Sequence, residues 1–87
     1  MDLAKPIAFS VHAREKMLDR GATEGGIMTA IRTGSPEPAR KGRLMFRKNF
    51  PFSDQWRGKR SAVRQVAPVV TEAAGRLVGV TVFVFSF

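Results

Sequence analysis

The hydrophobic pattern of this chain changes its period near Arg43, and this change limits the folds that the chain can adopt. Before Arg43, apolar residues recur about every three or four positions, as they do on one face of an α-helix. From Arg43 onward, Leu44, Phe46 and Phe50 alternate with residues that would point the other way, as they do on a β-strand. Helices and strands are therefore segregated along the sequence, which is typical of an α+β fold.

Two helices are predicted before this change of period. The first lies between Ser10, whose hydroxyl can accept N–H groups of the first turn, and Gly21, which can adopt the left-handed conformation that ends many helices. The second is expected from about Glu24 to Thr33. Thr23 can serve as its N-cap, and Gly34 ends it.

Four segments have the composition of strands, and the last of them is predicted to be central. It is apolar on both faces, as a strand covered on both sides would be. Pro68 falls inside the preceding strand and predicts either an edge position or a bulge there. Between Pro51 and Lys59 we expect a wide connection that contains aromatic residues. The predicted strands are Lys5–Phe9, Arg43–Phe50, Arg60–Thr71 and Leu77–Phe87.

The predicted architecture has the order β-α-α-β-β-β, with two N-terminal helices packed on one face of an antiparallel sheet of three to four strands. A chain of 87 residues has room for one domain, which spans residues 1–87. The longest apolar run, Leu77–Phe87, is about half the roughly 20 residues that a membrane helix needs, so no membrane contact is predicted. The count of Cys 0 excludes disulfides and favours a reducing cytoplasm.

The charge of the chain favours a phosphate-rich partner, and RNA or another nucleic acid is the leading class. Lys and Arg number 15 against 7 Asp and Glu, which gives a net charge of +8. Nine of these cations lie between Arg40 and Arg64, close to Phe50, Phe52 and Trp56, on which bases could stack. The alternative is a solvated face above core aromatics. The predicted nucleic-acid-binding residues are Arg43, Arg47, Lys48, Trp56, Lys59, Arg60 and Arg64.

A candidate catalytic stripe lies on the first helix, where His12, Lys16 and Arg20 share one face. Cleavage of RNA without metal needs a base and cations that stabilise the phosphate. We expect His12 to carry the proton, with Lys16 and Arg20 holding the phosphate. The alternatives are a structural His12 bonded to a carbonyl or carboxylate, and a salt bridge from Arg20 to Glu24. One histidine, no cysteine and scattered acids give no metal-ligand spacing, and no cofactor is predicted.

Several short motifs occur together along the chain. Phe9-Ser10 precedes His12-Ala13, the helix closes on Arg20-Gly21, and Trp56-Arg57-Gly58-Lys59 and Val80-Thr81-Val82 follow. In these motifs the chain resembles the bacterial domain-of-unknown-function family numbered 4258. The resemblance implies kinship with the RelE and ParE toxin fold and with small metal-independent ribonuclease toxins. That family favours arginine at Lys16 and an aromatic hydroxyl at Ser61 and Ser86, and with Tyr 0 the present chain has no phenol.

Two functional hypotheses result, beside a third reading in which the domain is purely structural or binds protein. In the first, a toxin-like protein binds RNA in a basic groove and cleaves it without metal. In the second, the same fold binds nucleic acid or an acidic protein, such as a cognate antitoxin, without catalysis. The apolar C-terminal strand could also pair with a second copy, which would give a homodimer through a sheet edge.

Overall fold

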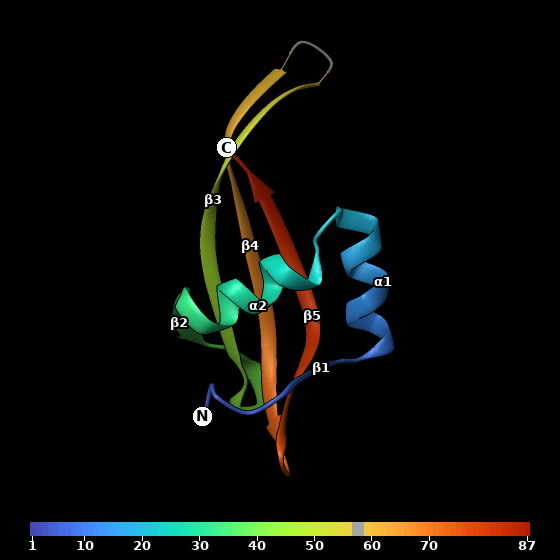
Figure 1. Cartoon of the computed structure of the whole chain (residues 1–87), viewed down its shortest axis with the longest axis vertical. Helices are drawn as coiled ribbons and strands as arrows, with labels where there is room; N and C mark the ends of the chain where they lie inside the picture. The colour runs from blue at the N-terminus through green and yellow to red at the C-terminus, as the bar shows by residue number, and fades with distance from the viewer. Residues whose placement is uncertain (57–58) are drawn as a thin grey trace.

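The computed structural model describes residues 1–56 and 59–87, and within 52–56 and 59–62 it describes only the backbone. It confirms the predicted α+β class and both helices, and it adds a strand directly after the second helix (Figure 1). The described elements are β1 (Ile7–Phe9), α1 (Val11–Arg20), α2 (Glu24–Thr33), β2 (Ser35–Pro38), the 3-10 turn η1 (Arg40–Gly42), β3 (Leu44–Trp56), β4 (Lys59–Ala73) and β5 (Arg76–Ser86).

The strands form one mixed sheet in the order β1-β5-β4-β3-β2. The prediction of a wholly antiparallel sheet is wrong at one edge, where β1 runs parallel to β5, and the other neighbours are antiparallel. The predicted count of three to four strands is too low, because the sheet has 5. The strand without a counterpart in the prediction is β2, whose Pro36 and Pro38 indicated only the end of a helix. Prolines are tolerated on this outermost strand because its outer side has no ladder to which an N–H must donate.

β4 is the central strand, so the prediction that Leu77–Phe87 would be central is wrong. β5 lies second in the sheet, and its outer neighbour β1 pairs only with residues 77–79. Beyond Gly79, no described strand pairs with the outer edge of β5. The strand is apolar on both faces for a different reason: one face packs into the core and the other carries exposed aromatic rings.

Pro68 lies inside the central strand and interrupts the hydrogen-bond ladder between β4 and β3. The pairing of β3 with β4 stops at Met45 and Val69 and resumes at Lys48 and Val66. The gap arises because proline has no N–H to donate. A register shift against β5 follows shortly after the proline. The predicted edge position is therefore wrong, and the predicted irregularity is present.

The wide connection predicted between Pro51 and Lys59 is largely strand. β3 continues to Trp56 and β4 begins at Lys59, with a register shift between Pro51 and Asp54. The polar composition of this stretch argued against a strand. Pairing with a neighbouring strand overrides such weak local preferences. Residues 57 and 58 lie outside the described part of the chain.

Both helices pack on the same face of the sheet, where the core lies (Figure 1). α2 crosses β3 and β4, and α1 lies along β5. The helices and the sheet bury a common set of side chains. Phe46 of β3 belongs to this set, so even-numbered residues of β3 point to the helices and odd-numbered residues point away from them. The buried cluster consists of Met17, Ile27, Ile31, Phe46, Val66, Val70, Leu77 and Val82.

The helix ends follow the sequence prediction in detail. The Ser10 hydroxyl accepts the Ala13 N–H at 3.1 Å, and Gly21 has a φ of 67°. Thr23 caps α2 by accepting the Gly26 N–H at 3.1 Å. Gly34 allows the end of α2 to approach β3 closely, because an added Cβ would lie 2.3 Å from one backbone carbonyl oxygen and 2.8 Å from another.

A small ionic cluster fastens the N-terminal segment to β4. The Glu72 carboxylate accepts the Asp2 N–H at 3.1 Å and forms an ion pair with the Lys5 ammonium at 3.2 Å. The hydrogen bond from Asp2, followed by the contact with Lys5, lowers the pKa of Glu72 below its ordinary value of 4.5. This cluster therefore holds the chain most firmly while Glu72 is ionised.

Candidate nucleic-acid interface

The face of the sheet away from the helices carries an aromatic strip, which we define as Phe83, Phe85 and Phe87. Val82 is buried in the core, so the alternating residues 83 and 85 point to the opposite side. The three phenylalanines are 39%, 40% and 64% exposed. The Phe83 and Phe85 rings lie nearly parallel, with 6.3 Å between their centroids and 14° between their planes. The strip therefore presents flat apolar surfaces to solvent.

Two arginines flank this strip from different elements. The Arg20 guanidinium, at the end of α1, lies 5.4 Å from the Phe83 ring centroid. The Arg47 guanidinium, from β3, lies 5.7 Å from the Phe85 ring centroid. Arg47 reaches across β4 over the position of Ala67, which is fully buried and small. Such cation–π contacts contribute only about 0.5 to 1 kcal/mol each at exposed sites, but they fix the rings and the cations side by side.

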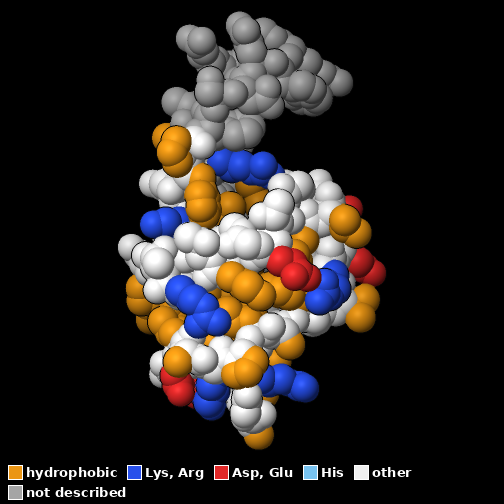
Figure 2. Space-filling model, in the orientation of Figure 1, with side chains coloured by type: hydrophobic (Ala, Val, Ile, Leu, Met, Phe, Trp, Pro, Cys, Tyr) orange, Lys and Arg blue, Asp and Glu red, His pale blue; other side chains and the backbone are white. Residues whose placement is uncertain are grey.

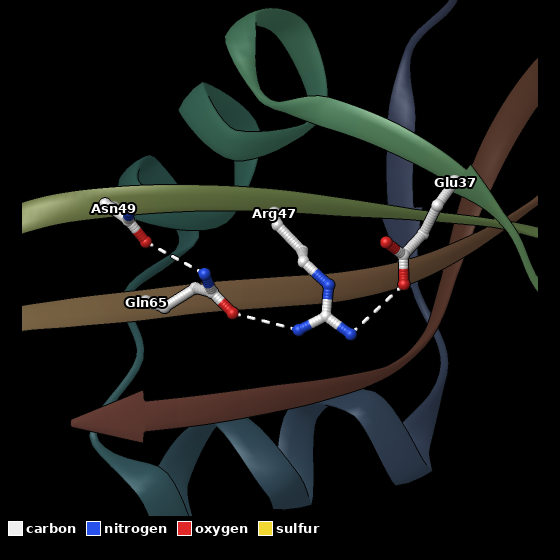
Figure 3. Close-up of polar contacts among 4 residues, drawn as sticks. All are labelled: Glu37, Arg47, Asn49 and Gln65. Carbon is white, nitrogen blue, oxygen red and sulfur yellow. Dashed lines mark hydrogen bonds and ion pairs between the residues drawn. The ribbon is translucent and has the colours of Figure 1, made fainter. Parts of the chain in front are cut away.

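Next to Arg47, a row of hydrogen bonds crosses three strands on the same face, and we call it the polar row (Figure 3). Arg47 donates to Glu37 at 3.1 Å and to Gln65 at 2.9 Å. Gln65 in turn donates to Asn49 at 2.9 Å. A cleft of about 460 Å³ lies beside the row, and it is lined by Thr33, Gly34, Ser35, Arg47, Lys48, Asn49 and Gln65.

Arg20 also forms a hydrogen bond to the outer edge of β5. Its guanidinium donates to the Val82 carbonyl at 2.6 Å, and its own carbonyl accepts a hydrogen bond from Arg64. A cation beside the last carbonyls of α1 is favoured by the helix dipole. The predicted salt bridge from Arg20 to Glu24 is wrong, because Glu24 pairs with Arg14 at 2.7 Å.

Arg64 lies on the helix side of the sheet, opposite to Arg47. It lines an apolar cleft of about 210 Å³ with residues of the turn between α1 and α2. The structure therefore brings Arg20 and Arg64 together, whereas Arg47 meets Arg20 only across the aromatic strip. Figure 2 shows the helix side, on which the Lys and Arg side chains lie in separate groups among apolar and acidic ones.

His12 lies in the first turn of α1 and is exposed. Among the described residues, none forms a hydrogen bond or an ion pair with its imidazole. Arg20 follows eight positions later, about 12 Å further along the helix axis. Lys16 lies between them and is half-buried. The three side chains share the predicted stripe, and among the described hydrogen bonds Arg20 is the member of the stripe that bonds to the sheet.

The other predicted nucleic-acid-binding residues are dispersed. Lys48 borders the cleft beside the polar row, and Arg43 lies between η1 and the start of β3. The side chains of Trp56, Lys59 and Arg60 lie outside the described part of the chain. The aromatic strip was not predicted, although phenylalanine at every second position from 83 to 87 is the pattern of a single strand face. Glu37, Asn49 and Gln65 were not predicted, because their hydrogen bonds join different strands and depend on a register that periodicity does not give.

In the described part of the chain, no group of three or more His, Asp or Glu side chains is placed to hold a metal ion. Neither described helix has the length and apolar character needed to cross a bilayer. Comparison of the chain with protein-family models, with curated proteins and with solved structures found no match.

Proposed function

We propose that this protein binds single-stranded RNA on the open face of its sheet. The observation that carries the proposal is the aromatic strip with two arginines against it, Arg20 beside Phe83 and Arg47 beside Phe85. Single-stranded bases stack on exposed aromatic rings and on guanidinium planes, and arginines also bind phosphates. The Phe83 and Phe85 ring centroids lie 6.3 Å apart, so each ring can present its own surface.

The exposure of the strip supports a binding role. Protein surfaces seldom leave several large apolar side chains contiguous unless the patch binds something. Each flanking arginine also retains unused donors, because a guanidinium carries five N–H groups and the hydrogen bonds described use one or two. The net charge of +8 supplies the long-range attraction to phosphate.

The geometry supports binding more strongly than cleavage. Cleavage by the predicted stripe would require one RNA to contact His12 and the sheet together, and His12 lies toward the opposite end of α1 from Arg20. The coarse arrangement, two N-terminal helices followed by antiparallel strands, is compatible with the RelE and ParE kinship that the sequence motifs imply. Because the motifs imply this kinship, the proposal includes a toxin-like role in the cytoplasm, with a cognate antitoxin as partner.

The test is the affinity of a labelled single-stranded RNA of about ten nucleotides, measured by fluorescence anisotropy at low salt. Phe85→Ala should weaken binding roughly 5- to 150-fold, because one base stack contributes about 1 to 3 kcal/mol. Leu18→Ala is the matched control, since Leu18 is an apolar side chain on α1 that is 85% exposed. It should bind like the wild type.

Two results would overturn the proposal. One is the absence of wild-type binding at low salt, and the other is equal affinity in Phe85→Ala and Leu18→Ala. A second copy of the chain could cover the aromatic strip instead of RNA. Analytical ultracentrifugation of the same proteins measures whether they dimerise. A wild-type dimer that Phe85→Ala converts to a monomer would assign the strip to self-association.

A further inference from the structure

The hydrogen bonds of the polar row run in one donor-to-acceptor order, and Arg47 determines that order. A guanidinium can only donate hydrogen bonds, so Gln65 must turn its Oε1 atom toward Arg47. The Nε2 group of Gln65 then faces Asn49 and requires an acceptor there. Asn49 supplies its Oδ1 atom, which leaves its NH₂ group outside the row. Glu37 holds the other end by accepting from Arg47 at 3.1 Å.

Asn49 is placed where a bound base could meet this NH₂ group. It is exposed, and it lies on β3 just beyond the last residue that pairs with β2. Across the sheet it pairs with Gln65, which in turn pairs with Phe85. Two strand spacings separate Asn49 from Phe85, about 10 Å, with Gln65 between them. The Arg47 guanidinium lies over the Phe85 ring and bonds to Gln65, so a base stacked on this guanidinium would have one edge toward Asn49.

We infer that Asn49 acts as a donor-only reader of RNA and selects bases whose facing edge carries adjacent acceptors, guanine above adenine. The inference rests on the proposed RNA binding. An asparagine with both amide atoms free suits adenine, because it accepts from N6 and donates to N7. Here the hydrogen bond from Gln65 holds Oδ1 toward β4 and turns the NH₂ group outward, so the adenine N6 group meets a donor instead of an acceptor. The O6 and N7 atoms of guanine can instead both accept from the NH₂ group.

Arg47 is the cation on the same face as Asn49, and its guanidinium has N–H groups beyond those that bond to Glu37 and Gln65. These donors can bind the phosphate of the nucleotide that Asn49 reads. Lys48 lines the same cleft, but as an even-numbered residue of β3 it points to the helix side. Glu37, the one carboxylate of the polar row, lies at its other end and is held by Arg47. The Asn49 end of the polar row therefore carries no carboxylate.

The experiment compares two single-stranded RNAs that differ only in having guanine or adenine within a uridine-rich sequence. Binding is measured by fluorescence anisotropy for the wild type, Asn49→Asp and Gln65→Glu. The wild type should prefer the guanine RNA by at least about fivefold, the lower end of what one bidentate contact provides. Asn49→Asp should lose that preference, because a carboxylate replaces the NH₂ group by an acceptor.

Gln65→Glu is the sharper variant because it leaves Asn49 unchanged. A carboxylate at position 65 still accepts from Arg47 but cannot donate to Asn49. The Asn49 amide should then turn its NH₂ group toward position 65 and expose Oδ1, which lowers or reverses the preference for guanine. The added negative charge weakens the binding of both RNAs to the same extent, so the quantity to compare is the ratio of the two affinities. Thermal unfolding confirms that both isosteric variants fold.

The outcomes separate this inference from the proposed function. A guanine preference that both variants lower supports it. Equal wild-type affinity for the two RNAs, or a guanine preference that both variants retain, overturns the donor-only assignment while RNA binding stands. Failure of the wild type to bind either RNA at low salt overturns the proposed function and the inference with it.

Discussion

Arg20 should stabilise the fold, and Arg20→Met tests how much. Methionine keeps the apolar stem but removes the hydrogen bond to the Val82 carbonyl and the cation over Phe83. A hydrogen bond from a charged group contributes about 1.5 to 3 kcal/mol, and an exposed cation–π contact about 0.5 to 1 kcal/mol. The freed carbonyl lies at an outer strand edge, where water can replace the arginine in part. We expect a loss of about 2 kcal/mol.

Thermal unfolding followed by circular dichroism measures this loss. For a domain of this size, about 2 kcal/mol corresponds to a fall in Tm of roughly 8 to 16 °C. Arg76→Met is the control, because Arg76 is exposed and has no partner among the described residues. It should change stability by less than about 0.5 kcal/mol. Equal Tm values for the two variants would refute a structural role for Arg20. A confirmed loss would mean that the activity of Arg20 variants must be compared at matched folded fractions.

Three further predictions concern other parts of the chain. Gly34→Ala should destabilise the protein in urea by roughly 1 to 3 kcal/mol through overpacking. Gly25→Ala, with no atom within 4 Å of the new Cβ, should be neutral or stabilising, and equal effects would contradict the close approach of α2 to β3. Because the folded-state pKa of Glu72 is lowered, its contribution is present above its ordinary value of 4.5 and is lost as the pH falls through the folded-state pKa. Glu72→Gln should therefore lose less stability on acidification than the wild type, and parallel losses would exclude the Lys5 cluster as a cause. His12→Ala tests the catalytic hypothesis in RNA incubated with EDTA, where no cleavage by the wild type, or undiminished cleavage by the variant, would eliminate it.

The features that sequence analysis predicted well are local ones. Ser10, Gly21 and Thr23 cap the helices as expected, because capping depends on a few neighbouring residues. The strand order was not predictable in this way, since Leu77–Phe87 has the same composition whether it lies at the centre or beside it. The length of β3 was missed because its polar half is held by pairing with β4.

The candidate site depends still more on distant contacts. Arg20 meets the Val82 carbonyl across 62 positions of sequence, and Arg47 meets Gln65 across 18. Neither pairing follows from helical or strand periodicity. The stripe of His12, Lys16 and Arg20 is correct as helix geometry, but periodicity alone could not show that Arg20 turns to the sheet edge.

The most direct test of the proposed function maps the RNA on the protein by NMR. Isotope-labelled protein is titrated at low salt with a single-stranded RNA of about ten nucleotides. Amide shifts should concentrate on the open face, at Arg47, Gln65, Phe83 and Phe85, while the residues around His12 stay unchanged. Shifts confined to the helices, or none on addition of excess RNA, would contradict RNA binding on the open face of the sheet.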